Sequence, residues 1–361
     1  AVKAGPQRRA AQESSAGTIY TVQVNAFKRR CFFIGAPLQK SAISVHFQAL
    51  ARELVRRGHV AVMISPRGEG ESEPKNDSFR IYFWPSLRPT RFADAAFLWN
   101  LVSRYRPDCL VANFGPVNWM CVVGWLRKVP TRIAWYHTLT TQIDADTVLS
   151  PRKLRILRFR KRFVYRSATH LAVNSEAAVD DARRIFDVPA AKSKVWPNSL
   201  PDPERFAGLR DSAEREDLIT CVGRFDWTKG QDVLVEALAR CREKLGANRI
   251  EFLGTGPLLD AVRAQADRCG VLGQCDFRGA VPHVEVLTRM ARSRFTVVPS
   301  RSEAFGLANI ESMAVATPVI ASNVDGIRII MRDGVDGFLV PPGDPAALVA
   351  RIVQLRDSPT L

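Results

Sequence analysis

Two glutamates, Glu303 and Glu311, are separated by seven residues in the second half of this 361-residue chain. One apolar run ends at Pro299 and another begins at Pro318, and apolar residues between them recur at helical spacing, so the pattern predicts strand, loop, helix and strand. Glu303 then lies at the carboxyl end of a strand, where open α/β sheets bind ligands. The first amides of the helix, near Gly306, favour an anion. Carboxylates beside such a helix end predict a ligand with hydroxyls and phosphates, such as a nucleotide sugar.

A pair of cations, Arg224 and Lys229, occupies a second loop of the same kind. An apolar run over 217–223 ends in Gly, and an amphipathic helix is predicted to begin at Gly230. Arginine offers a planar fork and lysine a point charge, so together they can neutralise a pyrophosphate. We therefore expect this loop to bind the phosphates of the same ligand.

Both patterns resemble signatures of the retaining glycosyltransferases with the two-domain GT-B fold, in the large group 1 (family 4) set. The Glu-x7-Glu motif of that family matches Glu303 and Glu311, and its Gly-Arg-x4-Lys-Gly motif matches Gly223 to Gly230. The resemblance implies that Glu303 is catalytic beside the donor sugar and that Glu311 binds the ribose. The positions that it assigns to the donor phosphates are Arg224, Lys229, Gly306 and Leu307.

Further positions follow the family pattern less closely. Gly254, in a Gly-x-Gly-Pro strand end, and Arg278, beside a strand end that contacts the base, would bind the nucleoside together with Glu311. Ala316 stands where the family usually has Gly. The turn-rich segment 333–343 is predicted to form a hairpin before a last helix at about 345–356. Similar proteins continue with helices that cross back onto the first domain, so the chain is expected to be truncated or unusually short.

The first half alternates between predicted strands and helices. A helix over 44–58 has an apolar side and ends in Gly. Alternation of this kind predicts a parallel, doubly wound sheet. The resemblance implies the GT-B architecture, with two Rossmann-like α/β domains facing each other across a cleft. The predicted strands are 30–35, 59–65, 109–113, 131–136 and 170–174.

Three prolines between 196 and 203 interrupt this alternation and mark a domain boundary. We expect residues 18–198 to form an acceptor-binding domain and residues 199–361 a donor-binding domain. Residues 1–17 are polar and are interpreted as a disordered tail or as residues added for expression. They lack the apolar core of a signal peptide.

His137 directly follows a predicted strand and therefore faces the cleft. The family has a histidine there, at the reaction centre near the donor sugar, which implies a catalytic role for His137. The loop after the first strand departs from the family's Gly-Gly turn: Gly35 is kept, but Pro37 removes an amide donor. Lys40 and Ser41 could replace that turn chemically in binding the acceptor.

The excess of positive over negative charge belongs to the first half of the chain. Residues 1–198 contain 32 Lys and Arg against 14 Asp and Glu, whereas residues 199–361 contain 20 and 22. The segment 151–166 holds eight cations on a predicted helix that also has a broad apolar surface. It is either a solvated helix or a patch that contacts an anionic partner, such as a phospholipid surface or a lipid-phosphate acceptor. The candidate patch residues are Arg155, Arg158, Arg160, Lys161 and Arg162.

Composition narrows the class of protein. Seven scattered cysteines without a Cys-x-x-Cys pair or a His cluster indicate a reducing cytosol and predict neither a disulfide framework nor a metal site. The longest apolar run is too short to cross a bilayer. We expect a cytoplasmic enzyme, peripheral at the inner face of the membrane, that uses a nucleotide sugar as substrate, needs no cofactor, and transfers the sugar to a glycan or lipid-linked acceptor of the cell envelope.

Two other functions stay open at this point. A nucleotide-sugar 2-epimerase or a sugar phosphorylase would keep the GT-B fold, although the combined motifs favour a transferase. A basic nucleic-acid-binding protein would fit the sequence pI of about 10.0. Against it, the charge is concentrated in one apolar-backed helix, and no recognition motif for nucleic acid is present.

Overall fold

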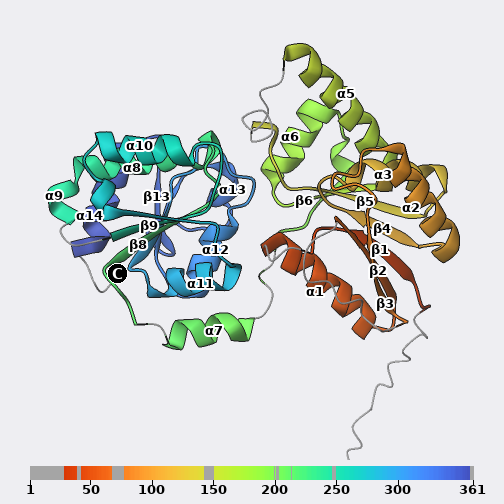
Figure 1. Ribbon diagram of the computed structural model, residues 1–361, viewed down its shortest axis with the longest axis horizontal. Coiled ribbons are helices and arrows are strands. Elements are labelled where there is room, and N and C mark those ends of the chain that lie inside the picture. Colours follow the sequence, from red (N-terminus) through yellow and green to blue (C-terminus); the bar gives the residue numbers. More distant parts are fainter. Residues whose placement is uncertain are drawn as a thin grey trace, which may run out of the picture.

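Two parallel β-sheets, each with helices on both faces, form two domains that lie side by side (Figure 1). This computed structural model describes residues 28–38, 42–66, 77–141, 150–198, 200, 203–212, 214–245 and 249–357. The predicted two-domain α/β architecture is confirmed.

The first sheet has seven strands in the order β3-β2-β1-β4-β5-β6-β7, and every neighbouring pair is parallel. Its order reverses between β1 and β4, which is the switch point where such sheets bind ligands. The strands are β1 (Cys31–Gly35), β2 (Val60–Ser65), β3 (Phe79–Phe83), β4 (Cys109–Ala112), β5 (Thr131–Tyr136), β6 (His170–Val173) and β7 (Ser193–Val195).

The second sheet has six parallel strands in the order β10-β9-β8-β11-β12-β13. The six strands of this sheet are connected in the same order as β1 to β6 of the first sheet. The switch point of the second sheet lies between β8 and β11. The strands are β8 (Leu218–Val222), β9 (Arg249–Leu253), β10 (Cys275–Gly279), β11 (Phe295–Val298), β12 (Val319–Ser322) and β13 (Gly337–Val340).

Helices cover the first sheet unequally. Phe47 and Ala51 of α1 are buried against one face, whereas the opposite face is covered by four helices with a larger shared core (Figure 1). These residues recur at helical spacing because one stripe of each helix must leave water. The helices are α1 (Ala42–Arg56), α2 (Phe92–Tyr105), α3 (Val117–Leu126), α5 (Pro151–Ser167) and α6 (Glu176–Phe186).

The second sheet is covered on one face by α8, α10 and α14, and on the other mainly by α11 and α12 (Figure 1). Helix α7 packs against α11 and α12, so it belongs to this domain. The helices are α7 (Pro203–Ser212), α8 (Gln231–Arg240), α9 (Arg242–Leu245), α10 (Leu259–Arg268), α11 (His283–Arg292), α12 (Leu307–Ala314), α13 (Asp325–Arg328) and α14 (Pro345–Asp357).

The predicted hairpin after residue 333 is wrong. Residues Gly337–Val340 form β13, which pairs in parallel with β12 and so extends the sheet. The turn residues before it end a crossover instead of joining two antiparallel strands. Within the part of the chain that the structure describes, no helix has both the length and the apolar character needed to span a bilayer.

Candidate functional site

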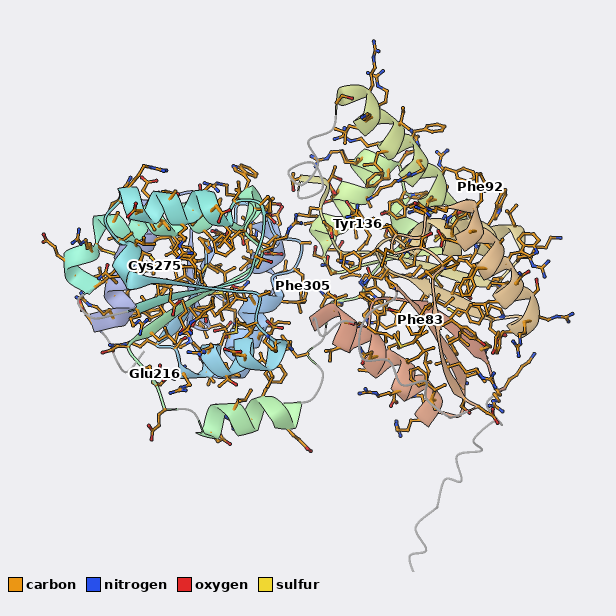
Figure 2. All side chains as sticks on the ribbon, viewed as in Figure 1. Phe83, Phe92, Tyr136, Glu216, Cys275 and Phe305 are labelled. Carbon is orange, nitrogen blue, oxygen red and sulfur yellow. The ribbon has the colours of Figure 1, made fainter. Side chains whose placement is uncertain are left out.

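A cleft of about 510 Å³ lies between the two domains, at the carboxyl ends of strands from both sheets. Phe305 of the second domain lies on the side that faces the first domain, and Tyr136 of the first domain lies near the same boundary (Figure 2). The structure brings seven of the predicted site residues together on the walls of this cleft. They are His137, Arg224, Lys229, Glu303, Gly306, Leu307 and Glu311.

An ion pair joins the two predicted catalytic and phosphate-binding loops. Lys229 Nζ lies 2.5 Å from Glu303 Oε2, and the two side chains are only 22% and 12% exposed. Ser300 Oγ donates a longer hydrogen bond of 3.4 Å to the same carboxylate oxygen. The acid and the cation are 74 residues apart in the chain. Each is therefore held in position by the other, at the switch point of the second sheet.

Close backbone approach explains why Gly230 follows the lysine. Gly230 has φ +67°, in the left-handed region, and a Cβ there would lie 2.1 Å from the carbonyl oxygen of Pro299. Only glycine fits both requirements. The loop after β8 and the loop after β11 can thus touch, which brings Lys229 to Glu303.

The beginning of α12 faces the cleft with its positive end. Gly306 is the N-cap residue, with φ +82°, and it provides no side-chain oxygen to the first amides of the helix. The first turn contains no acidic residue. Leu307 and Ala308 line the cleft beside it. The dipole of the helix and its first amides therefore favour a phosphate or another anion there.

Glu311 is buried and is hydrogen-bonded to a histidine that the sequence analysis did not single out. His283 Nε2 lies 2.7 Å from Glu311 Oε1. His283 is the first residue of α11, directly after Pro282, and it also lines the cleft. The signal in the sequence that could have predicted this role was a histidine at the first position of a helix, shortly after the end of a strand. The contact fixes the Glu311 carboxylate, and no hydrogen bond from the described residues reaches its second oxygen.

His137 closes the cleft from the first domain. Its two ring nitrogens are buried and have no hydrogen-bond partner among the described residues. Burial, and secondarily the charge of Lys161, lowers the pKa of His137 to about 4. The imidazole is therefore neutral at pH 7 and can both donate and accept a hydrogen bond. Phe114 packs edge-on against it, with ring centroids 4.4 Å apart.

Asn174 is a second residue that the sequence analysis did not assign to the site. It follows β6, lines the cleft and is almost completely buried. Its Nδ2 donates to the backbone oxygen of His137 at 3.5 Å, whereas its Oδ1 has no partner in the described part of the chain. A buried amide oxygen of this kind accepts a hydrogen bond in most proteins, and a ligand hydroxyl could supply it.

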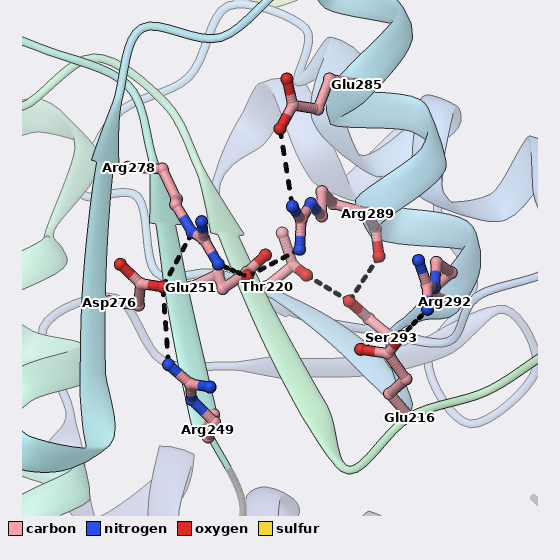
Figure 3. A network of polar contacts seen from close by, with 10 residues as sticks. All are labelled: Glu216, Thr220, Arg249, Glu251, Asp276, Arg278, Glu285, Arg289, Arg292 and Ser293. Atoms are coloured by element: carbon pink, nitrogen blue, oxygen red, sulfur yellow. Dashed lines mark hydrogen bonds and ion pairs between the residues drawn. The ribbon is translucent and has the colours of Figure 1, made fainter.

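Arg278 does not line the cleft. It forms an ion pair with Glu251 at 2.9 Å and another with Asp276 at 2.8 Å, while Arg289 approaches Glu251 at 3.0 Å from α11 (Figure 3). The Glu251 carboxylate thus lies between two arginines and links β9 and β10 to α11. Gly254 is also outside the lining of the cleft. A Cβ at this position would lie 2.0 Å from the carbonyl oxygen of Gly223, so the glycine allows the strand end to pack closely against the end of β8.

The predicted acceptor loop is only partly described. Gly35 ends β1 and is packed against α3, since a Cβ there would lie 2.3 Å from Met120 Sδ. It is not part of the cleft lining. Lys40 and Ser41 lie outside the described residues.

The five cations of the predicted anionic-partner patch do not share one surface of α5. Arg155 and Arg160 are exposed, and Arg158 is half-buried. Arg162 is exposed but forms an ion pair with Asp187 at the end of α6. Lys161 is half-buried and lines a cavity of the first domain.

A set of His, Cys, Asp and Glu side chains suited to holding a metal ion is absent from the described residues. Burial raises the pKa of several cysteine thiols, to about 12 for Cys109, Cys121 and Cys221. These thiols are consequently unreactive structural groups.

The fold and the cleft together define a two-domain glycosyltransferase architecture. The family model of the glycosyl transferases group 1 matches residues 207–361, and that of Glycosyltransferase Family 4 matches residues 43–202. The first match covers the second domain and the second match covers the first domain. Together the two matches span most of the chain, which therefore belongs among the glycosyltransferases.

Curated relatives carry glycosyltransferase names. The chain is 34% identical over 259 residues to a D-inositol 3-phosphate glycosyltransferase of Geodermatophilus obscurus, covering 64% of this chain and 56% of that protein. It is 29% identical over 328 residues to the glycosyltransferase MJ1607 of Methanocaldococcus jannaschii, covering 85% and 83%. The chain thus spans about half the length of the first of these relatives.

Solved structures share the fold at low sequence identity. The sucrose-phosphate synthase of Thermosynechococcus elongatus superposes with a TM-score of 0.73 at 19% identity, covering 92% of this chain and 90% of that one. HepE of Anabaena, solved with UDP and glucose, superposes with a TM-score of 0.66 at 17% identity, covering 91% and 90%.

Proposed function

We propose that this chain is a retaining glycosyltransferase that moves a hexosyl unit from a nucleotide sugar to an acceptor held by the first domain. One observation carries the proposal: Lys229, Glu303 and Glu311 converge with His137 on a single cleft, although they come from four segments and two domains. HepE, with the same fold, was solved with UDP-glucose, which supports a nucleotide-sugar donor for this chain.

The leaving diphosphate would be stabilised by cationic groups that are already in position. Lys229, Arg224 and the positive end of α12 border the same space. Charge that develops on the departing phosphate as the anomeric carbon–oxygen bond breaks meets fixed donors, so little reorganisation is needed. Lys229 would exchange its ion pair with Glu303 for the phosphate when the donor binds, so that it is in place before the bond breaks.

The remaining cleft residues would orient the sugar nucleotide. Glu311, held by His283, would accept hydrogen bonds from the ribose hydroxyls. Glu303, released from Lys229, would bind hydroxyls of the transferred sugar near the anomeric carbon. Neutral His137 and the free oxygen of Asn174 would contact that sugar from the first domain. In a retaining transfer the acceptor attacks from the face that the diphosphate leaves.

Nucleotide binding can be tested by thermal unfolding with UDP, GDP, ADP and their common sugar conjugates. A ligand at about 100 times its dissociation constant adds about 2.7 kcal/mol to the free energy of unfolding. One base should raise the melting temperature, and Lys229→Met should remove most of the rise. If no nucleotide shifts unfolding, the donor site does not exist. The anomeric configuration of the product, read by NMR, tests retention.

We also propose that the first domain attaches peripherally to an anionic membrane at the cytoplasmic face, where a lipid-linked or glycan acceptor of the cell envelope is available. Phe159, 75% exposed, and Phe163 project from α5 between exposed cations, and Phe163 meets Trp125 of α3 with ring centroids 6.3 Å apart. Phe92 of α2 also lies on the outer surface of this domain (Figure 2). Exposed aromatic residues among cations favour the interface of an anionic bilayer.

Flotation with vesicles tests this attachment. The protein should bind vesicles that contain phosphatidylglycerol and not vesicles of phosphatidylcholine alone, and salt should weaken binding because the attraction is screened. Phe159→Ser should reduce binding, whereas Val284→Ser, at an exposed position of the second domain, should not. Equal binding to both kinds of vesicle, or none to either, would contradict the proposal.

A further inference from the structure

A second cavity, of about 360 Å³, lies inside the first domain between the end of β5, the beginning of α3 and the inner face of α5. It shares three lining residues with the donor cleft: Phe114, His137 and Thr138. These shared residues form the boundary between the two spaces. A molecule seated in the second cavity therefore lies next to the position that we assign to the donor sugar.

Lys161 lines this cavity from an unusual position on its helix. It falls on the same stripe of α5 as the apolar residues Leu157 and Val164, four residues after one and three before the other. Its ammonium makes a cation–π contact with the ring of Phe186, at 5.9 Å from the centroid, and no described residue gives it a carboxylate partner. Burial, and secondarily Arg160, lowers the pKa of Lys161.

A half-buried ammonium that faces a cavity without an anion is costly, and proteins rarely keep one without use. The cavity lining contains no Asp or Glu that could compensate it. The pKa of the lysine is lowered from an ordinary value near 10.5, and an anionic ligand would reverse that shift. The missing charge partner is therefore expected to come from a bound molecule.

The beginning of α3 adds a second positive feature to the same cavity. Gly115, Val117 and Asn118 line the cavity at the N-terminus of this ten-residue helix. The N-cap residue, Pro116, makes no side-chain hydrogen bond to the helix, and no acid is present in the first turn. The amides of Val117 and Asn118 donate long hydrogen bonds of 3.3 Å to the backbone oxygens of Phe114 and Gly115, and no acid in the first turn offsets the positive end of the helix dipole.

Backbone strain occurs at the boundary with the donor cleft. Phe114 has φ +53°, in the left-handed region that non-glycine residues adopt at a cost. This conformation places its ring edge-on to His137, with centroids 4.4 Å apart. Strain of this kind persists where the surrounding structure enforces it, and it is concentrated at functional sites.

We propose that the second cavity binds an anionic group of the acceptor, a phosphate or carboxylate, with Lys161 as its counter-ion and the beginning of α3 as a second contact. The inference rests on the transferase function proposed above and specifies its acceptor. The acceptor hydroxyl would lie beyond the anion, past Phe114 and His137, next to the donor sugar. A soluble phosphate monoester and a phospholipid headgroup both present this group.

Inorganic phosphate is a suitable probe once the donor site is filled. The nucleoside diphosphate that stabilises the wild type is kept saturating, and ionic strength is held constant with chloride. Phosphate binding is followed by the intrinsic tryptophan fluorescence, to which Trp135 in the cavity lining contributes. Saturable binding is expected. Lys161→Met should weaken it at least about tenfold, whereas Lys153→Met, at an exposed position of the same helix, should leave it unchanged.

A second variant covers the case in which Lys161→Met fails to fold. Asn118→Asp keeps the shape of the side chain and places a negative charge at the start of α3, where an acid suits the helix dipole. This variant should fold and should also bind phosphate at least about tenfold more weakly. Unchanged phosphate affinity in either folded variant, or no saturable binding to the nucleotide-loaded wild type, overturns the inference. Nucleotide binding is measured in the same samples. If the nucleotide binds and phosphate does not, the inference fails while the proposed transferase function stands; if the nucleotide does not bind, the proposed function fails.

The two sources of the anion are separated by competition. Phosphate is displaced either by glycerol 3-phosphate or by vesicles that contain phosphatidic acid in phosphatidylcholine. Displacement by the soluble ester alone assigns a soluble acceptor, and displacement by the vesicles alone assigns a lipid headgroup. In each case Lys161→Met should remove the displacement, and a displacement that survives this substitution contradicts the role of Lys161.

Discussion

Replacing Glu303 by Gln should separate nucleotide binding from sugar transfer. In the structure the Glu303 carboxylate is 2.5 Å from Lys229 Nζ, and both side chains are largely buried. A diphosphate that uses Lys229 must first displace this carboxylate. The amide of Gln has nearly the same shape but no charge, so the substitution frees the lysine without opening a hole.

The expected magnitudes follow from this geometry. An exposed ion pair contributes about 0.2–1 kcal/mol, and the partial burial of Lys229 and Glu303 places their pair near the upper end. Glu303→Gln should therefore tighten binding of the free nucleoside diphosphate by about fivefold. Transfer should slow by roughly 10- to 150-fold, because a hydrogen bond from the sugar to a charged acceptor contributes about 1.5–3 kcal/mol.

Calorimetric titration of the free diphosphate and initial rates with the nucleotide sugar measure the two effects. Glu236→Gln is a matched control, since Glu236 forms an exposed ion pair with Arg240 on α8, outside the cleft lining. The control should change neither quantity. Tenfold weaker diphosphate binding in Glu303→Gln, or turnover equal to the wild type, would refute the exchange of partners that we assign to Lys229.

Three further predictions concern stability. The pKa of His137 is about 4 in the folded chain and 6.5 ordinarily, so its contribution to the free energy of unfolding is complete above pH 6.5 and is lost as the pH drops towards 4. His137→Gln should flatten this loss in urea unfolding measured at several pH values. An unchanged pH dependence would exclude His137 as its source. Ala316 is exposed and has φ +56°, in the left-handed region that costs a residue with a Cβ, so Ala316→Gly should raise the free energy of unfolding by about 1 kcal/mol and raise the melting temperature. A lower melting temperature would show that the backbone of Ala316 is not strained. Glu251→Gln should lower the free energy of unfolding in urea by about 2–3 kcal/mol, because Arg278 and Arg289 lose a carboxylate that is 5% exposed. Nucleotide affinity should stay unchanged, and a loss of affinity would place this network in the donor site.

The sequence predicted the strands and helices whose signals are local. The strand over 131–136 is found at the predicted positions, and most others end within one or two residues of their prediction. The hairpin was wrong because Gly337–Val340 pairs with a strand that precedes it by a complete crossover. The same turn residues serve either connection, so the direction of pairing is decided by tertiary packing.

The site was predicted where chemistry and spacing coincide in one loop, as at Lys229 and at Glu303. Their mutual contact could not be predicted, since it depends on how the loops after β8 and β11 meet. Lys161 was grouped with its cationic neighbours, although its spacing from Leu157 and Val164 places it on the apolar stripe. A lysine within an apolar stripe was the signal in the sequence that could have distinguished Lys161 from its neighbours. Counting the charges of the whole helix did not reveal it.

The shared wall of Phe114, His137 and Thr138 bears on how a transferase avoids wasting its substrate. Water is the smallest nucleophile that can reach an activated sugar, and it is far more abundant than any acceptor. An acceptor hydroxyl that approached the sugar past this wall, as proposed above, would leave little room for a water molecule beside it. Resistance to hydrolysis would then depend on the bulk of Phe114 where the two cavities meet.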